Sequence, residues 1–128
     1  MFVRKVATRL KPGAQDEFVR MMEQQVLPWL RQQEGFLDLI ILVAPDQSEI
    51  ATLSFWREQA YAENYAVAGY PEVLSLLEKL LDARPYVKTF EVVSSSMEKL
   101  SPGATGGQEH SVRDTVSRTL FRPYEANV

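Results

Sequence analysis

One stretch of the chain gathers the side chains that could do chemistry on a small molecule. An indole, an amide and three phenols follow one another there: Trp56, Tyr61, Asn64, Tyr65 and Tyr70. An amide and a phenol can hydrogen-bond an oxyanion, and an electron-rich phenolate or enolate held in a dry pocket can react with dioxygen without a metal. Tyrosines on an amphipathic helix also serve as core or rim residues, and Trp56 either lines a pocket or closes the rim of the fold.

Other catalytic and metal-binding residue sets are missing from the sequence. The chain has no cysteine, and its single histidine, His110, lies in a glycine-rich segment. Thiolate chemistry therefore has no candidate, and the preceding region offers no imidazole as a base or as a haem ligand. The carboxylates show no spacing that brings three hard ligands together, and no glycine-rich loop joins a strand to a helix. We expect neither a metal nor any other cofactor.

Asp38 is the one acid within the apolar run from Phe36 to Val43. A side chain at that position would face a cavity, an interface or solvent. A raised pKa there would make its carboxylate a candidate base, so Asp38 joins the candidate site residues.

Apolar spacing predicts the elements that position these side chains. Alternation with a period of two indicates strands at 2–11 and 86–93, a continuous apolar run indicates one at 36–43, and the turn after that run makes 50–56 the second arm of a hairpin. Helical spacing indicates helices at 13–33, 58–66 and 71–81. Pro28 should kink the first helix or end its regular part, because proline has no N–H and clashes with the preceding turn. Gly35 is placed to end that helix in a left-handed conformation.

The order strand, helix, strand, strand, split helix, strand predicts a ferredoxin-like α+β fold, because a right-handed crossover leaves a gap that the third strand fills. We expect a four-stranded antiparallel sheet with the strand order 4-1-3-2. The strand expected at 36–43 is apolar on both faces. The protein's own helices can cover one face of an antiparallel sheet, and a second subunit would cover the other, so we predict a homodimer that packs through its sheet faces.

Five short segments carry a family resemblance: Lys11–Gly13, Val26–Leu30, Glu34–Phe36, Ser54–Arg57 and Pro71–Leu81. In these segments the chain resembles the antibiotic biosynthesis monooxygenase family, whose members are small dimeric α+β barrels. The resemblance covers about residues 2–95. Each matching element also has a structural task, so the resemblance is more specific for the fold than for the chemistry.

The resemblance implies roles for the candidate residues. In oxygenase members, a Trp, an Asn and Tyr residues of this region, helped by an Arg, bind a phenolic substrate and stabilise its anion. The nearest catalytic equivalents are Asn64, Tyr65 and Tyr61, and the substrate-binding candidates are Trp56, Tyr70, Arg84 and Asp38, with Arg57 as another possible cation. Haem-degrading members use a histidine in the second helical region and an Asn on the first strand, and this chain has neither.

We therefore predict a cofactor-independent monooxygenase that acts on a small aromatic or quinol-like molecule in a pocket between sheet and helices. The alternative is a non-catalytic dimeric module of the same fold that binds a small molecule or another partner. The absence of histidine and cysteine from the folded region favours this alternative.

Composition limits the partners and the location. A net charge of -3 without a clustered basic patch argues against nucleic-acid binding. No apolar segment approaches the roughly 20 residues that span a bilayer, and the N-terminal residues lack a signal-peptide pattern, so we expect a cytoplasmic protein without a membrane partner. Residues 1–95 should form the folded domain. Residues 96–128 should form a linker and tail that is partly disordered or docked on the domain or on a partner subunit.

Overall fold

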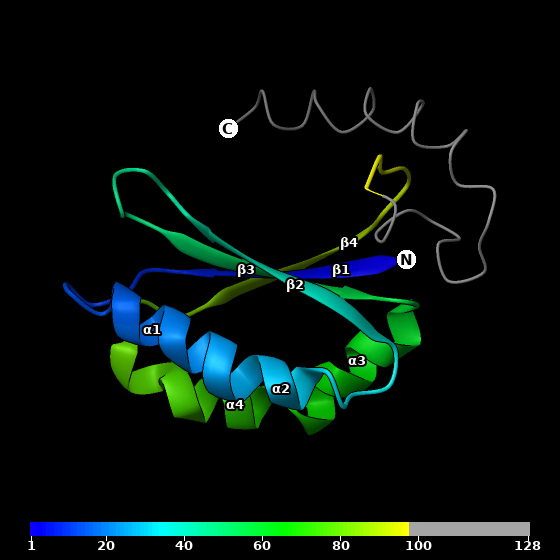
Figure 1. Cartoon of the computed structure of the whole chain (residues 1–128), viewed down its shortest axis with the longest axis horizontal. Coiled ribbons are helices and arrows are strands. Elements are labelled where there is room, and N and C mark those ends of the chain that lie inside the picture. The colour runs from blue at the N-terminus through cyan, green and yellow to red at the C-terminus, as the bar shows by residue number, and fades with distance from the viewer. Residues whose placement is uncertain (98–128) are drawn as a thin grey trace.

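The structure is a computed structural model that describes residues 1–97. Four strands form one antiparallel sheet: β1 (Phe2–Thr8), β2 (Phe36–Val43), β3 (Ile50–Trp56) and β4 (Tyr86–Glu91). Their order across the sheet is β2-β3-β1-β4, which confirms the predicted ferredoxin-like topology. The helices lie together on one face of the sheet (Figure 1). The predicted tail lies almost wholly outside the described residues.

The first helical segment changes its geometry part-way along. It consists of α1 (Gln15–Met21), the π-helical turn η1 (Met22–Val26) and α2 (Leu27–Leu30). In the π-helical turn the Leu27 N–H donates to the Met22 carbonyl, one residue further back than in an α-helix. Pro28 has no N–H, and its ring would crowd the carbonyl four residues earlier, so a wider turn relieves that clash. The disturbance predicted at Pro28 therefore takes the form of a π-helical turn.

The second helical region is split, as its sequence predicts. It consists of α3 (Gln59–Ala68), α4 (Tyr70–Leu77) and the short 3-10 helix η2 (Glu78–Leu80). Pro71 lies in the first turn of α4, where its missing N–H costs no hydrogen bond. Within residues 1–97, no helix is both long and apolar enough to cross a lipid bilayer.

Strand register decides which side chains face the helices. Arg4 of β1 lies opposite Ser54 of β3, and the neighbouring Val3 lies opposite Phe55. Because successive side chains point to opposite faces of a sheet, Arg4 and Ser54 face the helices, whereas Val3 and Phe55 face outward. Each face therefore carries its own apolar cluster, and the larger of the two lies under the helices.

The larger cluster forms the core of the domain. Its fully buried members include Leu30 and Trp56, which is 0% exposed. The first helical segment contributes one row of side chains to it, and α4 with η2 contributes another, as apolar spacing predicts. Both rows pack against the helix-facing side of the sheet.

One glycine fixes the junction between the first helical segment and the sheet. Gly35 has a φ of +83°, the left-handed conformation predicted for it. A Cβ at Gly35 would also overlap the ring of Tyr61, so only a glycine fits here. The Gly35 carbonyl accepts a hydrogen bond of 2.8 Å from the Arg57 N–H, which ties the start of β2 to the end of β3.

Candidate functional site

A cavity of about 50 Å³ lies between the sheet and the helices. Both layers of the fold contribute to it: the sheet through β1, β2 and β3, and the helical layer through the first helical segment and through α3 with α4. Most of its lining is apolar. The polar side chains of the lining are Arg4, Thr8, Thr52, Ser54, Tyr65 and Tyr70. Arg4 is the one charged residue among the lining residues that the structure describes.

Arg4 is buried under the helices, with 5% of its surface exposed. Its guanidinium carbon lies 4.1 Å from the ring centroid of Tyr70 and 5.5 Å from that of Tyr65, which is the geometry of a cation–π contact. Burial lowers the pKa of Arg4, and the two tyrosines oppose that effect. Since an arginine starts from a very high pKa, Arg4 keeps its positive charge at neutral pH.

Tyr65 and Tyr70 are protonated hydrogen-bond donors at neutral pH. Burial raises the pKa of Tyr65 to about 12, against an opposing effect of Arg4. Burial also raises the pKa of Tyr70, and the charge of Arg4 and its hydrogen bond to the Tyr70 hydroxyl oppose the rise. We call Arg4, Tyr65 and Tyr70 the Arg4–tyrosine cluster. It presents one cation and two phenolic hydroxyls beside a mainly apolar space.

A chain of aromatic rings holds Tyr65 in place. The ring of Trp56 stacks on Tyr65 with centroids 5.1 Å apart, and Trp29 and Tyr70 flank Tyr65 at 6.0 and 6.2 Å. Trp56 is itself fixed, because its indole N–H donates a hydrogen bond of 3.0 Å to the Ser54 hydroxyl oxygen. Tyr65 can therefore turn little without disturbing the core.

Comparison with known proteins identifies the family of this chain. The sequence model for antibiotic biosynthesis monooxygenases matches residues 1–66, which is more than half of the chain. The chain belongs to the antibiotic biosynthesis monooxygenase family. The match includes Arg4 and Tyr65 and ends just before Tyr70. Among curated protein sequences, none matches the chain significantly.

Solved structures share the fold of this family member. A monooxygenase of Streptomyces coelicolor, solved with the ligand nanaomycin D, has a TM-score of 0.61 and 21% identity over 70% of this chain and 84% of its own. A protein of unknown function from Nitrosomonas europaea has a TM-score of 0.62 and 16% identity over 73% of this chain and 89% of its own. A conserved protein of Methanosarcina mazei has a TM-score of 0.58 and 18% identity over 71% and 92%.

The structure brings three of the predicted site residues together. Tyr65 and Tyr70 line the cavity of this monooxygenase-family domain. Trp56 lies directly behind Tyr65 and does not border the cavity, so its contact with a ligand would pass through the Tyr65 ring. The structural role considered for Trp56 agrees with this place in the core.

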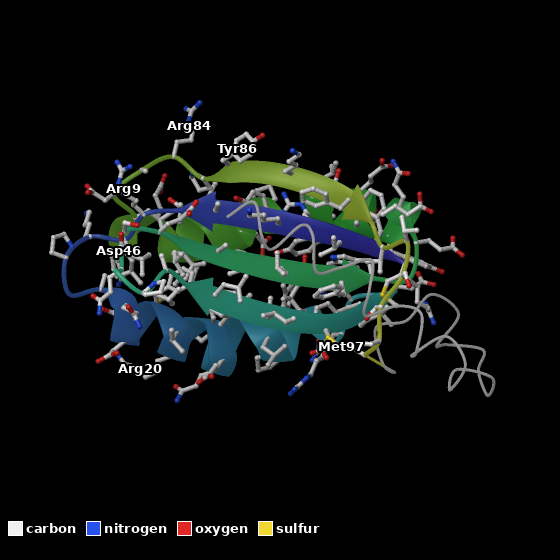
Figure 2. The ribbon with its side chains drawn as sticks, turned by 90° about the horizontal axis from the view of Figure 1, so that it is seen from above. Arg9, Arg20, Asp46, Arg84, Tyr86 and Met97 are labelled. Carbon is white, nitrogen blue, oxygen red and sulfur yellow. The ribbon has the colours of Figure 1, made fainter. Side chains whose placement is uncertain are left out.

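The other predicted residues lie away from the cavity. Asn64 is exposed on α3, and Tyr61 packs beside Gly35 under the guanidinium of Arg57, whose carbon is 5.2 Å from the ring centroid. Asp38 is paired with Phe55 on the outward face of the sheet, where its carboxylate accepts the Leu39 N–H. Figure 2 shows Arg84 projecting away from the sheet beside β4. None of these side chains borders the cavity.

Sequence reasoning missed Arg4, the cation that does border the cavity. On an isolated strand an arginine between Val3 and Lys5 resembles an ordinary surface charge. The available signal was its alternation with Phe2 and Val6, because an arginine in the same row as apolar residues must either be buried with them or lie at the edge of the sheet.

Two hydroxyl groups of the lining are engaged with backbone carbonyls. The Thr8 hydroxyl donates a hydrogen bond of 2.8 Å to the Ala83 carbonyl, and the Ser54 hydroxyl donates one of 3.4 Å to the Arg4 carbonyl. Neither a carboxylate nor an imidazole occurs in the described part of the lining. No group of three or more His, Cys, Asp or Glu side chains gathers within residues 1–97 in a way that could hold a metal ion. The arrangement can therefore stabilise negative charge on a bound molecule.

Proposed function

We propose that the chain is a cytoplasmic, homodimeric monooxygenase that oxidises a small aromatic or quinol-like molecule bound in the cavity between sheet and helices. The observation that carries this proposal is the Arg4–tyrosine cluster, because it places a cation and two phenols in the lining of a mainly apolar space. Family membership supplies the reaction type. The cluster supplies what such a reaction needs most, which is preorganised stabilisation of an oxyanion in a site that excludes water.

The proposed reaction balances without a separate reductant. A phenol and one dioxygen molecule give a quinone and one water molecule. One oxygen atom becomes the new ring carbonyl, and the other leaves as water with the hydrogens lost from the ring carbon and from the hydroxyl. Dioxygen takes all four electrons from the substrate. The Arg4–tyrosine cluster would hold the phenolate form, whose extra electron density makes the ring reactive.

The size of the cavity limits how a substrate enters. Its volume is about 50 Å³, whereas an apolar cavity of roughly 150 Å³ accommodates benzene. An aromatic ligand therefore requires movement of the lining side chains. On the α4 side, three residues of the cavity lining are partly exposed: Tyr70, Leu74 and Leu81. We propose that ligands enter the cavity between these side chains.

A homodimer would use the outward face of the sheet. This face carries the second apolar cluster, in which buried Val3 and Phe55 are packed against partly buried Met1, Leu37, Ile40, Leu53, Phe90 and Val92. Leu42 on β2 is also exposed. Apolar surface rimmed by polar groups such as Asp38 and Lys88 is the kind of surface that protein partners cover. We propose that a second copy of the chain covers it, sheet against sheet.

Oxygen consumption tests the proposed reaction. Purified protein is offered naphthols, hydroquinones and polycyclic phenols, while dioxygen uptake and quinone formation are both recorded. We expect one dioxygen consumed per quinone formed. Tyr65→Phe removes one oxyanion donor and should lower kcat by about 100-fold. Tyr86→Phe is the matched control, because Tyr86 is 64% exposed on β4 and does not belong to the lining (Figure 2).

The same assay tests the remaining sequence-based roles. The catalytic role of Asn64 and Tyr61 stays a prediction, and Asn64→Ala and Tyr61→Phe measure it. If Asn64→Ala abolishes turnover while Tyr65→Phe does not, the oxyanion site lies on the exposed side of α3 and our assignment to the cavity is wrong. Arg84→Gln tests the predicted binding role of Arg84 in the same way.

The second candidate function is a ligand-binding module without turnover. The absence of a carboxylate and an imidazole from the described lining favours it, because such a site has no obvious proton acceptor. Under this alternative, aromatic ligands bind and Tyr65→Phe weakens their binding, but no member of the panel consumes dioxygen above the uncatalysed rate.

A further inference from the structure

Arg4 is a buried cation without a counter-ion among the described residues. A guanidinium carries five N–H donors, yet its contacts within residues 1–97 are the rings of Tyr65 and Tyr70 and the Tyr70 hydroxyl. None of those contacts is a carboxylate. Burying an unpaired charge is costly, and proteins normally pair it or hydrogen-bond it fully. A residue of this kind that borders a cavity is placed to bind something that enters the cavity.

The cavity offers no group that would take a proton from a ligand. Tyr65 and Tyr70 are the only titratable side chains that border it besides Arg4, within the described chain, and both keep their protons at neutral pH. The Thr8 and Ser54 hydroxyls are engaged with backbone carbonyls. A ligand that must lose a proton to bind Arg4 would have to lose it before entry.

We propose that this cavity selects ligands that are already monoanions at neutral pH, and that the guanidinium of Arg4 is the group that recognises their charge. The ligand class is an aromatic carboxylate, or a phenol or enol acidic enough to be ionised in water. This inference rests on the proposed function only in placing the ligand in the same cavity. It adds the charge state of the ligand and names a specificity-determining residue on β1.

The surroundings of Arg4 define the class further. With a single cation in the described lining, a monoanion is neutralised, whereas a dianion would leave one charge uncompensated in an apolar space. The rings of Tyr65 and Tyr70 lie beside the guanidinium and provide flat apolar surfaces for an aromatic ligand. Neutral molecules of the same shape would leave the Arg4 charge unpaired and should bind more weakly.

The first experiment uses 4-nitrophenol, which ionises near neutral pH and changes its absorption spectrum when it does. Binding to the unmodified protein is titrated from acidic to alkaline pH, with the neutral methyl ether 4-nitroanisole as the matched isostere. We expect the apparent pKa of bound 4-nitrophenol to fall by about one unit, which means that the anion binds about 10-fold more tightly than the neutral form. The affinity for 4-nitroanisole should not change with pH over the same range.

Four variants then identify the residue that recognises the charge. Arg4→Gln should abolish the preference for the anion, and Arg4→Lys should restore part of it, because a lysine keeps the charge but not the planar fork. Arg20→Gln is the matched control, since Arg20 is exposed on the outer side of α1 (Figure 2). Arg84→Gln tests the competing cation. Calorimetry with benzoate and benzamide repeats the comparison with a carboxylate.

Two results would overturn the inference. One is a bound 4-nitrophenol whose apparent pKa is unchanged or raised in the unmodified protein, a measurement that does not depend on whether Arg4→Gln folds. The other is a preference for anions that survives Arg4→Gln but disappears in Arg84→Gln. Neither result requires turnover, so a protein that binds anions through Arg4 and consumes no dioxygen would refute the monooxygenase proposal and leave this inference intact.

Discussion

The two faces of the sheet carry different kinds of polar residue. On the helix-facing side, Arg4 and Ser54 are almost fully buried inside an apolar layer. On the outward side the ionisable groups, such as Lys5 and Asp38, lie around or between apolar side chains and are partly exposed. A buried polar group must be satisfied or it destabilises the fold, whereas a partly exposed one can use water.

The difference separates a polar group that the fold satisfies from one that it leaves facing the cavity. Ser54 is satisfied, because it accepts the Trp56 indole N–H and donates to the Arg4 carbonyl. The guanidinium of Arg4 is not matched in this way within the described chain, and it borders the cavity. The helix-facing side therefore holds the residue that is hardest to explain by stability alone. The outward side has the composition of a surface for assembly.

The largest effect should come from the centre of the helix-facing side. Trp56→Ala removes a fully buried indole that stacks on Tyr65, and such a truncation costs about 4 kcal/mol of unfolding free energy. Urea denaturation measures it. Tyr86→Ala, at an exposed position on β4, should change the unfolding free energy by less than about 0.5 kcal/mol. Similar losses in both variants would contradict the difference between the faces.

Gly13 and Gly35 have nearly equal backbone conformations but different surroundings. Comparing an alanine substitution at each position therefore distinguishes the cost of backbone strain from the cost of a steric overlap. Gly13 and Gly35 have φ values of +79° and +83°, but a Cβ at Gly13 meets nothing within 4 Å, whereas one at Gly35 overlaps Tyr61. We expect Gly13→Ala to cost about 1 kcal/mol and Gly35→Ala about 3 kcal/mol of unfolding free energy. Equal costs for the two variants would mean that Tyr61 moves aside freely and that this end of the domain is loosely packed.

Deprotonation of Tyr65 at alkaline pH should lower the unfolding free energy of the domain. Its pKa is raised from 10.0 to about 12, so the folded state favours the protonated phenol. The stabilisation is complete below about pH 10 and is lost between about pH 10 and 12, with a total of about 2.7 kcal/mol. Unfolding free energies measured across this window should fall in the unmodified protein and fall less in Tyr65→Phe. If the unfolding free energy falls equally with pH in the unmodified protein and in Tyr65→Phe, another group causes the loss of stability at alkaline pH.

A substitution on the outward face of the sheet should change the stability of the dimer. Leu53→Arg introduces a charge into the second apolar cluster, and we expect the dimer dissociation constant to rise by about 30-fold, or about 2 kcal/mol. Sedimentation velocity at several concentrations measures it. Val67→Arg, at an 80% exposed position on α3, is the control that adds the same charge without touching this face. An unmodified protein that sediments as a monomer throughout would remove the argument for the dimer.

Among the buried residues of the helix-facing side, Arg4 should have the smallest effect on stability. Arg4→Met replaces a buried cation by an apolar side chain of similar length, which removes a cation–π contact of about 2 kcal/mol together with the cost of burying an unpaired charge. We expect the unfolding free energy to change by less than about 1 kcal/mol while discrimination between benzoate and benzamide disappears. A loss as large as that of Trp56→Ala would show instead that Arg4 is a structural residue.

Sequence patterns predicted the fold because its strands and helices have strong periodicity. Four alternating or apolar runs and two helical regions, interrupted by Gly35 and by the hairpin turn around Asp46, left few topologies to consider. The ends of elements were less predictable. The first strand was expected to reach Lys11, but it ends at Thr8, and Leu10 makes only an isolated bridge to Leu81.

The candidate site was harder to predict because α3 has no clear apolar stripe. Many of its residues are alanines, which fit either side of a helix, so the sequence did not show that Tyr65 points inward and Asn64 outward. The position of Arg4 depended on the pairing of β1 with β3, a contact between segments 50 residues apart in the chain. Spacing within one segment cannot supply such a contact.

The two tryptophans give the domain unequal fluorescent reporters. Trp56 is fully buried, hydrogen-bonded to Ser54 and stacked on Tyr65, so its emission should lie at short wavelength and respond to whatever occupies the adjacent cavity. Trp29 is partly exposed at the end of the first helical segment, where a small soluble quencher can reach it. The intrinsic emission that survives quenching would therefore report on the interior beside Tyr65, without a label and without knowledge of the natural ligand.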